Sequence, residues 1–247
     1  MPAFSSPHAP LRRVVRIAAL LIPVVLAGCV STSQSPPQGQ ALQPDPVFAA
    51  MYGARPDEKF SLPATELMGV DPQFLRQEVA YPTREQPGTI IVDTTNRFLY
   101  QVRENGRALR YGIGVGKEGL AWSGRATIGR KAMWPRWTPT ADMIRREPER
   151  NKKWAGGMPA GLENPLGPRA LYLYANGRDT LYRIHGTSEP QSIGQAVSSG
   201  CIRLFNQDII DLFNRVPVGT PVVVLNNRMR MEDPMLMSEA EQSTLGL

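Results

Sequence analysis

The sequence predicts a mainly β fold, and three features of the chain carry that prediction. β-Branched and aromatic residues form runs at 89–92, 98–102 and 108–115, and such runs favour pleated strands. Asn-Gly pairs at 105–106 and 176–177 separate apolar runs, which is the strongest short-range signal for a β-hairpin. The residues that follow position 87 number roughly 160, a length that suits one compact domain.

The first 28 residues are typical of an export signal. The basic residues Arg12, Arg13 and Arg16 precede an apolar run at 17–26, which is too short to cross a bilayer. Leu26-Ala27-Gly28-Cys29 then matches a bacterial lipobox, in which the cysteine becomes the lipid-modified first residue. An ordinary secretory signal with an incidental cysteine is the alternative. The Arg12-Arg13 pair also invites a twin-arginine interpretation, but its flanking residues favour the general secretory route.

These features predict an exported protein that a lipid on Cys29 anchors on the periplasmic side of a membrane. The residue after the cysteine is Val30 rather than aspartate, which favours the outer membrane over the inner one. Residues 29–46 are rich in Ser, Gln and Pro, and we expect a disordered tether there. Residues 228–247 carry scattered acids and methionines and are expected to form a C-terminal tail.

Charge and composition exclude several classes of function. The chain has 28 basic and 22 acidic residues, and loss of the three signal arginines leaves 25 against 22. So small an excess does not indicate nucleic-acid binding, although it is compatible with an anionic cell-wall polymer. Tyr111 and Glu118 replace the glycine and the hydroxyl residue that a phosphate-binding loop needs around Gly116, so no nucleotide site is expected.

The middle of the chain predicts the following elements. Residues 47–86, called the pre-domain segment below, are expected to pack on the domain at 87–227, with a short helix from Asp71-Pro72 through Phe74, Leu75 and Val79. Three strands follow at 89–115. The stretch from Trp122 to Gly167 is punctuated by Pro and Gly and predicts an irregular insertion, with one short helix at 142–150.

The insertion is expected to serve as a lid or groove wall over the site described next, with Trp134 and Trp137 against sugar or peptide. The alternative is that these aromatic side chains simply pack the loop down. After it come strands at 170–174 and 180–184, a connector at 189–197, and a helix capped by Asn206 with Ile209, Phe213 and Val216 on one face. A buried strand at 221–225 closes the domain.

The candidate active site rests on His185 and Cys201. The chain has two histidines and two cysteines, and His8 and Cys29 belong to the signal region. If Cys29 carries a lipid, Cys201 has no disulfide partner. An imidazole that takes the proton of a thiol makes it a strong nucleophile. A lone buried cysteine and a satisfied core histidine are the alternative, and one His with one Cys falls short of a metal ligand set.

The residues around Cys201 favour catalysis. Gly200 permits a tight turn whose backbone N–H groups can face an oxyanion. Ile202 and Leu204 alternate with Arg203, which places Arg203 on the same strand face as Cys201. A guanidinium there favours the thiolate and can hold a substrate carboxylate.

His185-Gly186-Thr187 followed by Ser198-Ser199-Gly200-Cys201-Ile202-Arg203-Leu204 resembles the signature of the L,D-transpeptidase catalytic domain family (YkuD-like, of the ErfK/YbiS/YcfS/YnhG type). Further similarity lies at 113–116, 128–137, 164–167 and 219–222. The resemblance implies a β-sandwich-like fold with mixed sheets, one or two short helices and a long active-site loop. It implies Cys201 as nucleophile, His185 as proton acceptor and donor, and an assisting Arg203. Many members carry a second histidine at the position of Ser199, and other members carry a serine there.

The same resemblance implies the remaining site residues and the reaction. Gly200, Arg203, Ser199, Gly186 and Thr187 are expected to serve the oxyanion or the substrate, and a backbone carbonyl at 198–200 to orient His185. The substrate is the tetrapeptide stem of peptidoglycan, the product a 3→3 cross-link, and a carbapenem is expected to acylate Cys201. No cofactor is needed, and we expect a monomer.

Three alternatives stay open at this point. Water can resolve the same acyl-enzyme, which makes the protein a carboxypeptidase or endopeptidase. The acceptor can be a lysine of an outer-membrane protein, which makes it an anchoring enzyme. From a different class, the chain can be a catalytically silent lipoprotein that binds the cell wall.

Overall fold

The structure is a computed structural model, and it describes residues 45–116, 122–198 and 201–225 of the 247-residue chain. The predicted signal, Cys29, most of the tether and the C-terminal tail lie outside the described residues, as do Ser199 and Gly200. Within the described ranges, no helix has the length and apolar character needed to cross a membrane.

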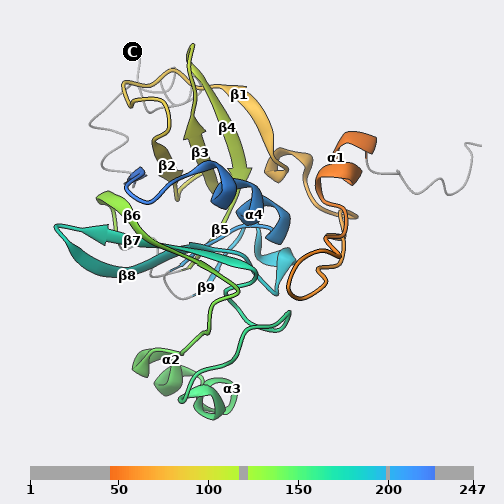
Figure 1. Cartoon of the computed structure of the whole chain (residues 1–247), viewed down its shortest axis with the longest axis vertical. Coiled ribbons are helices and arrows are strands. Elements are labelled where there is room, and N and C mark those ends of the chain that lie inside the picture. The colour runs from red at the N-terminus through yellow and green to blue at the C-terminus, as the bar shows by residue number, and fades with distance from the viewer. Residues whose placement is uncertain (1–44, 117–121, 199–200, 226–247) are drawn as a thin grey trace, which may run out of the picture. The chain divides into compact units, whose positions relative to one another are not determined.

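The described residues form one mixed sheet of eleven strands in the order β1-β4-β3-β2-β11-β6-β7-β8-β10-β5-β9 (Figure 1). The strands are β1 Gln77–Ala80, β2 Ile90–Asp93, β3 Phe98–Val102, β4 Arg107–Gly112, β5 Gly114–Gly116, β6 Gly124–Met133, β7 Arg169–Ala175, β8 Arg178–His185, β9 Ala196–Ser198, β10 Ile202–Arg203 and β11 Pro221–Leu225. Three pairs are parallel, namely β2 with β11, β8 with β10 and β5 with β9. The mainly β fold with mixed pairing is therefore confirmed.

The sheet folds back on itself. Strands β4 and β5 are second and tenth in the sheet order, yet only Ile113 separates them along the chain. The two ends of the sheet must therefore meet at Ile113, whose buried side chain belongs to the main core. This return gives the sandwich-like arrangement that the resemblance implied.

Both Asn-Gly pairs form the predicted hairpin turns. Asn105 and Gly106 have φ values of 59° and 65°, and Asn176 and Gly177 have values of 51° and 72°. Two consecutive positive φ angles define the turn whose twist matches that of the flanking strands, and Asn-Gly adopts it at little cost. The pairs β3–β4 and β7–β8 are antiparallel on either side of these turns.

The irregular insertion predicted from Trp122 is wrong over its first part, where the structure has the ten-residue strand β6. Buried Ala126 and Ile128 alternate with exposed Arg125 and Thr127, but the alternation is short and ends at Gly129. There the register with β7 shifts, because the glycine packs directly against the ring of Tyr174. Gly129 and the polar residues of this stretch made the strand unrecognisable from the sequence pattern.

The helices are α1 Pro46–Met51, α2 Ala141–Arg146, α3 Pro148–Asn151 and α4 Asn206–Arg215, with short 3-10 turns at Pro72–Phe74, Lys152–Trp154 and Pro190–Ser192. The helix expected at 142–150 is divided into α2 and α3, which project from the ends of β6 and β7 (Figure 1). The helix expected through Val79 is wrong, because the Asp71-capped turn ends at Phe74 and Val79 lies in β1 opposite Ala108.

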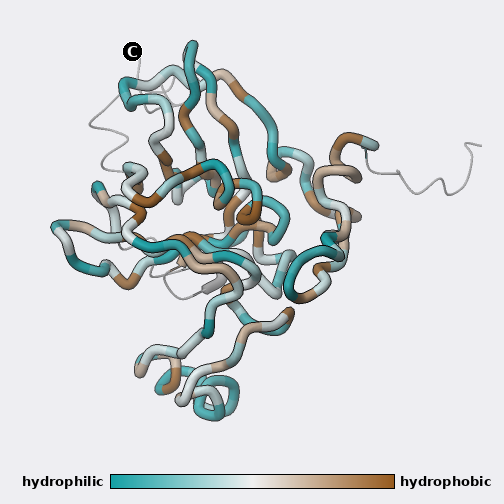
Figure 2. The backbone as a smooth tube through the Cα atoms, viewed as in Figure 1, coloured by the Kyte–Doolittle hydropathy of each residue, from teal (hydrophilic) through white to brown (hydrophobic). Residues whose placement is uncertain are grey.

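Helix α4 covers the main core. Ile209 and Leu212 pack with side chains of the central strands, among them Ile90, Leu99, Ile128, Leu171 and Ile184. Figure 2 shows the apolar residues gathered in the strands and in α4, whereas the hairpin tips are hydrophilic. The predicted helix face of Ile209, Phe213 and Val216 does contact this core.

Candidate active site

His185 and Cys201 are brought together by two neighbouring parallel strands. His185 ends β8, and Cys201 directly precedes β10. The register places Ile184 opposite Ile202 and His185 opposite Arg203. Paired residues of adjacent strands share a face, so buried Ile184 and Ile202 face the core while His185 and Arg203 lie on the other side. Cys201, two residues before Arg203, takes that same side.

The backbone carbonyl of Gly186 orients His185. The imidazole is only 3% exposed, and its Nδ1 lies 2.5 Å from the carbonyl oxygen of Gly186. Because a carbonyl can only accept, the proton of the neutral ring belongs on Nδ1. The Nε2 atom is then the nitrogen that can take a proton.

The imidazole is neutral near physiological pH. Burial, and secondarily the charge of Arg203, lower the pKa of His185 to about 3, while the carbonyls of Gly186 and Pro165 act in the opposite direction. A neutral imidazole is the form that can act as a general base.

The orienting carbonyl was expected at 198–200, where Ser199 and Gly200 lie outside the described residues; among the described residues, the carbonyl of Gly186 contacts Nδ1. A side chain at position 186 would not fit, since its Cβ would lie 2.3 Å from Asn206 Oδ1 and 2.9 Å from Pro168 Cδ. The glycine after the histidine was visible in the sequence, but the close approach of Asn206 was not. Asn206 was expected to cap α4, but it does not. Phe205 holds the N-cap position, and Asn206 Oδ1 accepts a 2.9 Å hydrogen bond from Thr187 N.

Thr187 stabilises the turn after His185. It is 2% exposed, its N–H is bound to Asn206, and its hydroxyl accepts a 2.9 Å bond from Glu189 N. Gly186 and Thr187 thus position this turn, and their expected oxyanion or substrate roles stay predictions. Ser199 and Gly200 remain predictions.

Arg203 is held by an acidic residue that the sequence did not single out. Its guanidinium donates to Glu189 Oε2 at 2.8 Å, and Glu189 Oε1 accepts from Arg150 of α3 at 2.7 Å. Burial acts to raise the pKa of Glu189, but the two arginines hold it below its ordinary value. Glu189 thereby connects the strand of Cys201 to the insertion.

A cleft of about 740 Å³ lies between the insertion and Arg203. Trp137 and Trp154 line it together with Arg150, Glu189 and Arg203, so Trp137 stands in a groove as expected. The groove role of Trp134 is wrong. This side chain is 6% exposed, donates from Nε1 to Glu58 Oε2 at 2.9 Å, and packs edge-on against Phe60.

The described residues contain no group of three or more His, Cys, Asp or Glu side chains that could hold a metal ion. The site is a histidine with a defined tautomer, beside a cysteine and an arginine on one sheet face, with a cleft along one side.

Residues 87–224 match the YkuD family model, described as the L,D-transpeptidase catalytic domain. The chain belongs to this family. It is 34% identical over 200 residues to the probable L,D-transpeptidase ErfK/SrfK of Escherichia coli (strain K12), an alignment that covers 76% of this chain and 61% of that protein. It is 32% identical over 166 residues to the putative L,D-transpeptidase YqjB of Bacillus subtilis (strain 168), with 65% and 86% covered.

The chain spans 61% and 49% of the length of two of its Escherichia coli relatives, ErfK/SrfK and YbiS. Among solved structures, an L,D-transpeptidase from Mycobacterium smegmatis is 17% identical, with a TM-score of 0.42 and 56% and 58% of the two chains covered. A Brucella melitensis structure described as a probable carnitine operon oxidoreductase is 50% identical, with a TM-score of 0.45 and 63% and 96% covered.

Proposed function

We propose that this chain is a peptidoglycan L,D-transpeptidase in which Cys201 is the nucleophile and His185 the general base. The observation that carries the proposal is the state of His185, a neutral imidazole with its proton on Nδ1, on the same sheet face as Cys201 and Arg203. Membership of the L,D-transpeptidase family supports the substrate.

The reaction has two halves. His185 Nε2 takes the Cys201 thiol proton, and the sulfur attacks the amide carbonyl between the third residue of a stem peptide and its terminal D-Ala. The C–N bond breaks as His185 returns the proton to the leaving amine, which leaves a thioester. An amine of a second stem then attacks the thioester, its proton passes through His185 to the departing Cys201 sulfur, and a 3→3 cross-link forms.

Two further groups support these steps. Backbone N–H groups at Gly200 and Cys201 are proposed to hold the oxyanion, each donor lowering the barrier by about 3 kcal/mol. Arg203 is proposed to attract a substrate carboxylate into the cleft, where Glu189 and Arg150 hold its guanidinium in place.

The cellular setting is also a proposal. The Arg-rich start, the short apolar run and the lipobox at Cys29 support export and lipid anchoring on the periplasmic side. Val30 supports the outer membrane. We propose that the enzyme acts there as a monomer on stem peptides.

Intact mass after incubation with a carbapenem tests the nucleophile. We expect one adduct on the full-length chain and none on the Cys201→Ala variant, with His185→Gln acylated at least a hundredfold more slowly. A folded wild-type chain that takes no adduct would overturn the enzymatic assignment in favour of a wall-binding lipoprotein. Incubation with purified tetrapeptide muropeptides then distinguishes transfer, which gives cross-linked dimers, from hydrolysis, which gives tripeptides alone.

A further inference from the structure

The pre-domain segment lies N-terminal to residues 87–224, which match the family model. We propose that this segment is part of the catalytic unit, because Tyr52 and Glu58 act as positioning residues that fix the imidazole of His185 along two separate routes. The inference rests on the proposed function of His185 and Cys201.

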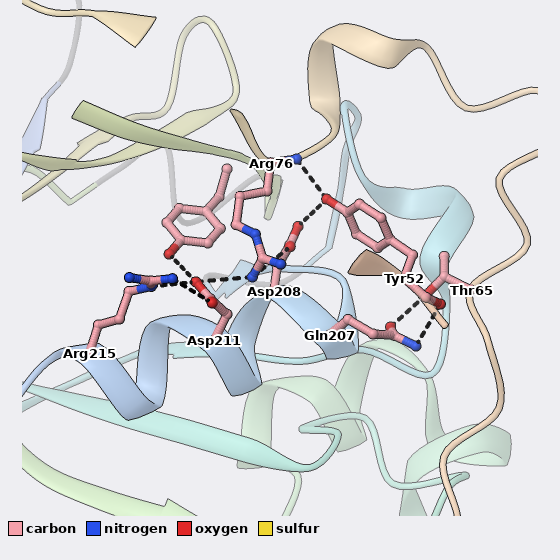
Figure 3. A network of polar contacts seen from close by, with 8 residues as sticks. Tyr52, Thr65, Arg76, Gln207, Asp208, Asp211 and Arg215 are labelled. Atoms are coloured by element: carbon pink, nitrogen blue, oxygen red, sulfur yellow. Dashed lines mark hydrogen bonds and ion pairs between the residues drawn. The ribbon is translucent and has the colours of Figure 1, made fainter. Parts of the chain in front are cut away.

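The first route begins at Gln207 in α4. Its side chain, in a residue that is 1% exposed, donates from Nε2 to the carbonyls of Tyr52, Gly53 and Pro63 at 3.2, 3.2 and 3.0 Å. Its Oε1 accepts from Thr65 Oγ1 at 2.6 Å (Figure 3). One α4 side chain therefore holds the pre-domain segment at four points.

The Tyr52 hydroxyl makes a second connection to α4. It donates to Asp208 Oδ2 at 2.9 Å and accepts from the backbone N–H of Arg76 at 2.6 Å. The Arg76 guanidinium pairs with Asp211 at 2.9 Å and lies 3.8 Å from Asp208 (Figure 3). Buried charges are costly unless they are paired, so the segment and the start of α4 depend on each other.

The start of α4 in turn holds the turn that carries His185. Leu204 N donates to the carbonyl of His185 at 2.9 Å, and Asn206 Oδ1 accepts from Thr187 N at 2.9 Å. Between them, the Gly186 carbonyl holds Nδ1 of the imidazole. Residues 204–208 thus transmit the position of the pre-domain segment to the ring of His185.

The second route begins at Glu58. Its carboxylate binds both terminal nitrogens of Arg169, at 2.9 and 2.6 Å, and accepts from Trp134 Nε1. The Arg169 carbonyl accepts from Gly186 N at 3.2 Å, and the next residue, Ala170, is paired with His185 across β7 and β8. A two-point carboxylate–guanidinium pair fixes orientation as well as distance, so Glu58 sets the strand beside His185.

A positioning role differs from a merely structural role in what a mild substitution changes. Loss of stability alone lowers the unfolding temperature but leaves the chemistry of the folded fraction unaltered. Displacement of His185 changes the proton transfer itself, because catalytic groups must lie within hydrogen-bonding reach. The reactivity of Cys201 in folded protein is therefore the decisive measurement.

The test uses the full-length chain as wild type, Tyr52→Phe, Glu58→Gln and the control Glu78→Gln. Glu78 belongs to the same segment, but its ion pairs with Arg103 and Arg107 are partly exposed and join β1 to the residue after β3 and to β4. Carbapenem acylation rates are measured by mass spectrometry well below each unfolding temperature. We expect at least a tenfold loss for Tyr52→Phe and Glu58→Gln, and a change below twofold for Glu78→Gln.

Alkylation of Cys201 by iodoacetamide across a range of pH is the second readout, with peptides resolved so that Cys29 does not contribute. We expect its midpoint to rise by at least half a pH unit in Tyr52→Phe and Glu58→Gln only. Wild-type rates and midpoints in both folded variants, or an equal loss in Glu78→Gln, would overturn the inference and leave the proposed function standing. If Glu58→Gln does not fold, Tyr52→Phe decides. An unacylated wild type overturns the proposed function itself.

Discussion

The tautomer of His185 follows from its immediate neighbour in the chain. The carbonyl oxygen of Gly186 lies 2.5 Å from Nδ1. This contact orients the ring without an acidic residue. Many catalytic histidines are oriented by a carboxylate, which also stabilises the imidazolium that forms during reaction. Here burial favours the uncharged ring, and the carbonyl of Gly186, which acts in the opposite direction, does not outweigh it.

The depressed pKa of His185 predicts a stability change in acid. Its unfolded pKa is near 6.5 and its folded pKa about 3, so below pH 6.5 the unfolded chain binds a proton that the native state does not. The stability present above pH 6.5 is therefore lost as pH falls, by roughly 2 kcal/mol from pH 7 to pH 5.

Urea unfolding of wild type and His185→Gln at pH 7 and pH 5 measures this loss. Glu58, Glu189 and Asp211 also titrate with lowered pKa values, but they are present in both proteins. The acid-induced loss should be smaller in the variant by about the amount above. An equal loss in both proteins would contradict a buried neutral imidazole.

Glu189 predicts a difference between two neighbouring substitutions. The Glu189→Gln variant leaves Arg203 uncompensated beside His185, and the added positive field makes the imidazole a weaker base. Arg150→Gln removes only a largely exposed partner, a contact of the class that contributes about 0–1 kcal/mol. We expect carbapenem acylation to slow at least fivefold in Glu189→Gln and less than twofold in Arg150→Gln. Equal rates in the two variants would show that Glu189 contributes nothing to acylation beyond its exposed contact with Arg150.

At the scale of elements, α4 carries both a core face and a buried ionic face. Its apolar side packs on the sheet through Ile209 and Leu212, while Asp208 and Asp211 point toward Arg76 of the pre-domain segment (Figure 3). Burial raises the pKa of Asp208 to about 7, although Arg76 and Tyr52 act to lower it. A helix that looks like an ordinary amphipathic one in sequence thus has two packed sides.

Asp208 predicts an opposite pH dependence to that of His185. Between pH 3.8, the ordinary pKa of an aspartate, and about pH 7, its pKa in the folded protein, the folded state keeps a proton that the unfolded chain has released. Its contribution to stability therefore falls as pH rises through this window. Asp208→Asn cannot titrate at this position. The unfolding temperature of the variant minus that of wild type should therefore be higher at pH 8 than at pH 5. A difference independent of pH would refute the raised pKa.

Local sequence signals succeeded where one turn or one strand decides the structure. The Asn-Gly turns, the strand at 221–225 and the short strand after Cys201 were all predictable from residue type and spacing. Strand β6 was missed because Gly129 breaks its alternation against Tyr174. Asn206 was misassigned because the same side chain can cap a helix or bind a distant N–H, and only the fold brings Thr187 within reach.

At the scale of the whole molecule, the sequence predicted which residues form the site but not what holds them. Cys201, His185 and Arg203 were picked out by scarcity and by family resemblance. The contact of Glu58 with Arg169 joins residues more than one hundred positions apart, and Tyr52 reaches Asp208 across an even longer separation. No periodicity reports such pairs, so the supporting residues emerged only from the folded arrangement.

Strand β11 has a further consequence for how the chain reaches this arrangement. It lies between β2 and β6, with Val222 beside both Ile90 and Ala126, so it joins the two halves of the sheet from within. Until residues 221–225 have been synthesised, both halves carry an open inner edge, and such edges invite pairing with other chains. Pairing at this sequence separation is intrinsically slow. The sheet of this protein therefore cannot close before Pro221–Leu225 is available, and a nascent chain halted before Pro221 is a candidate for aggregation or for a chaperone.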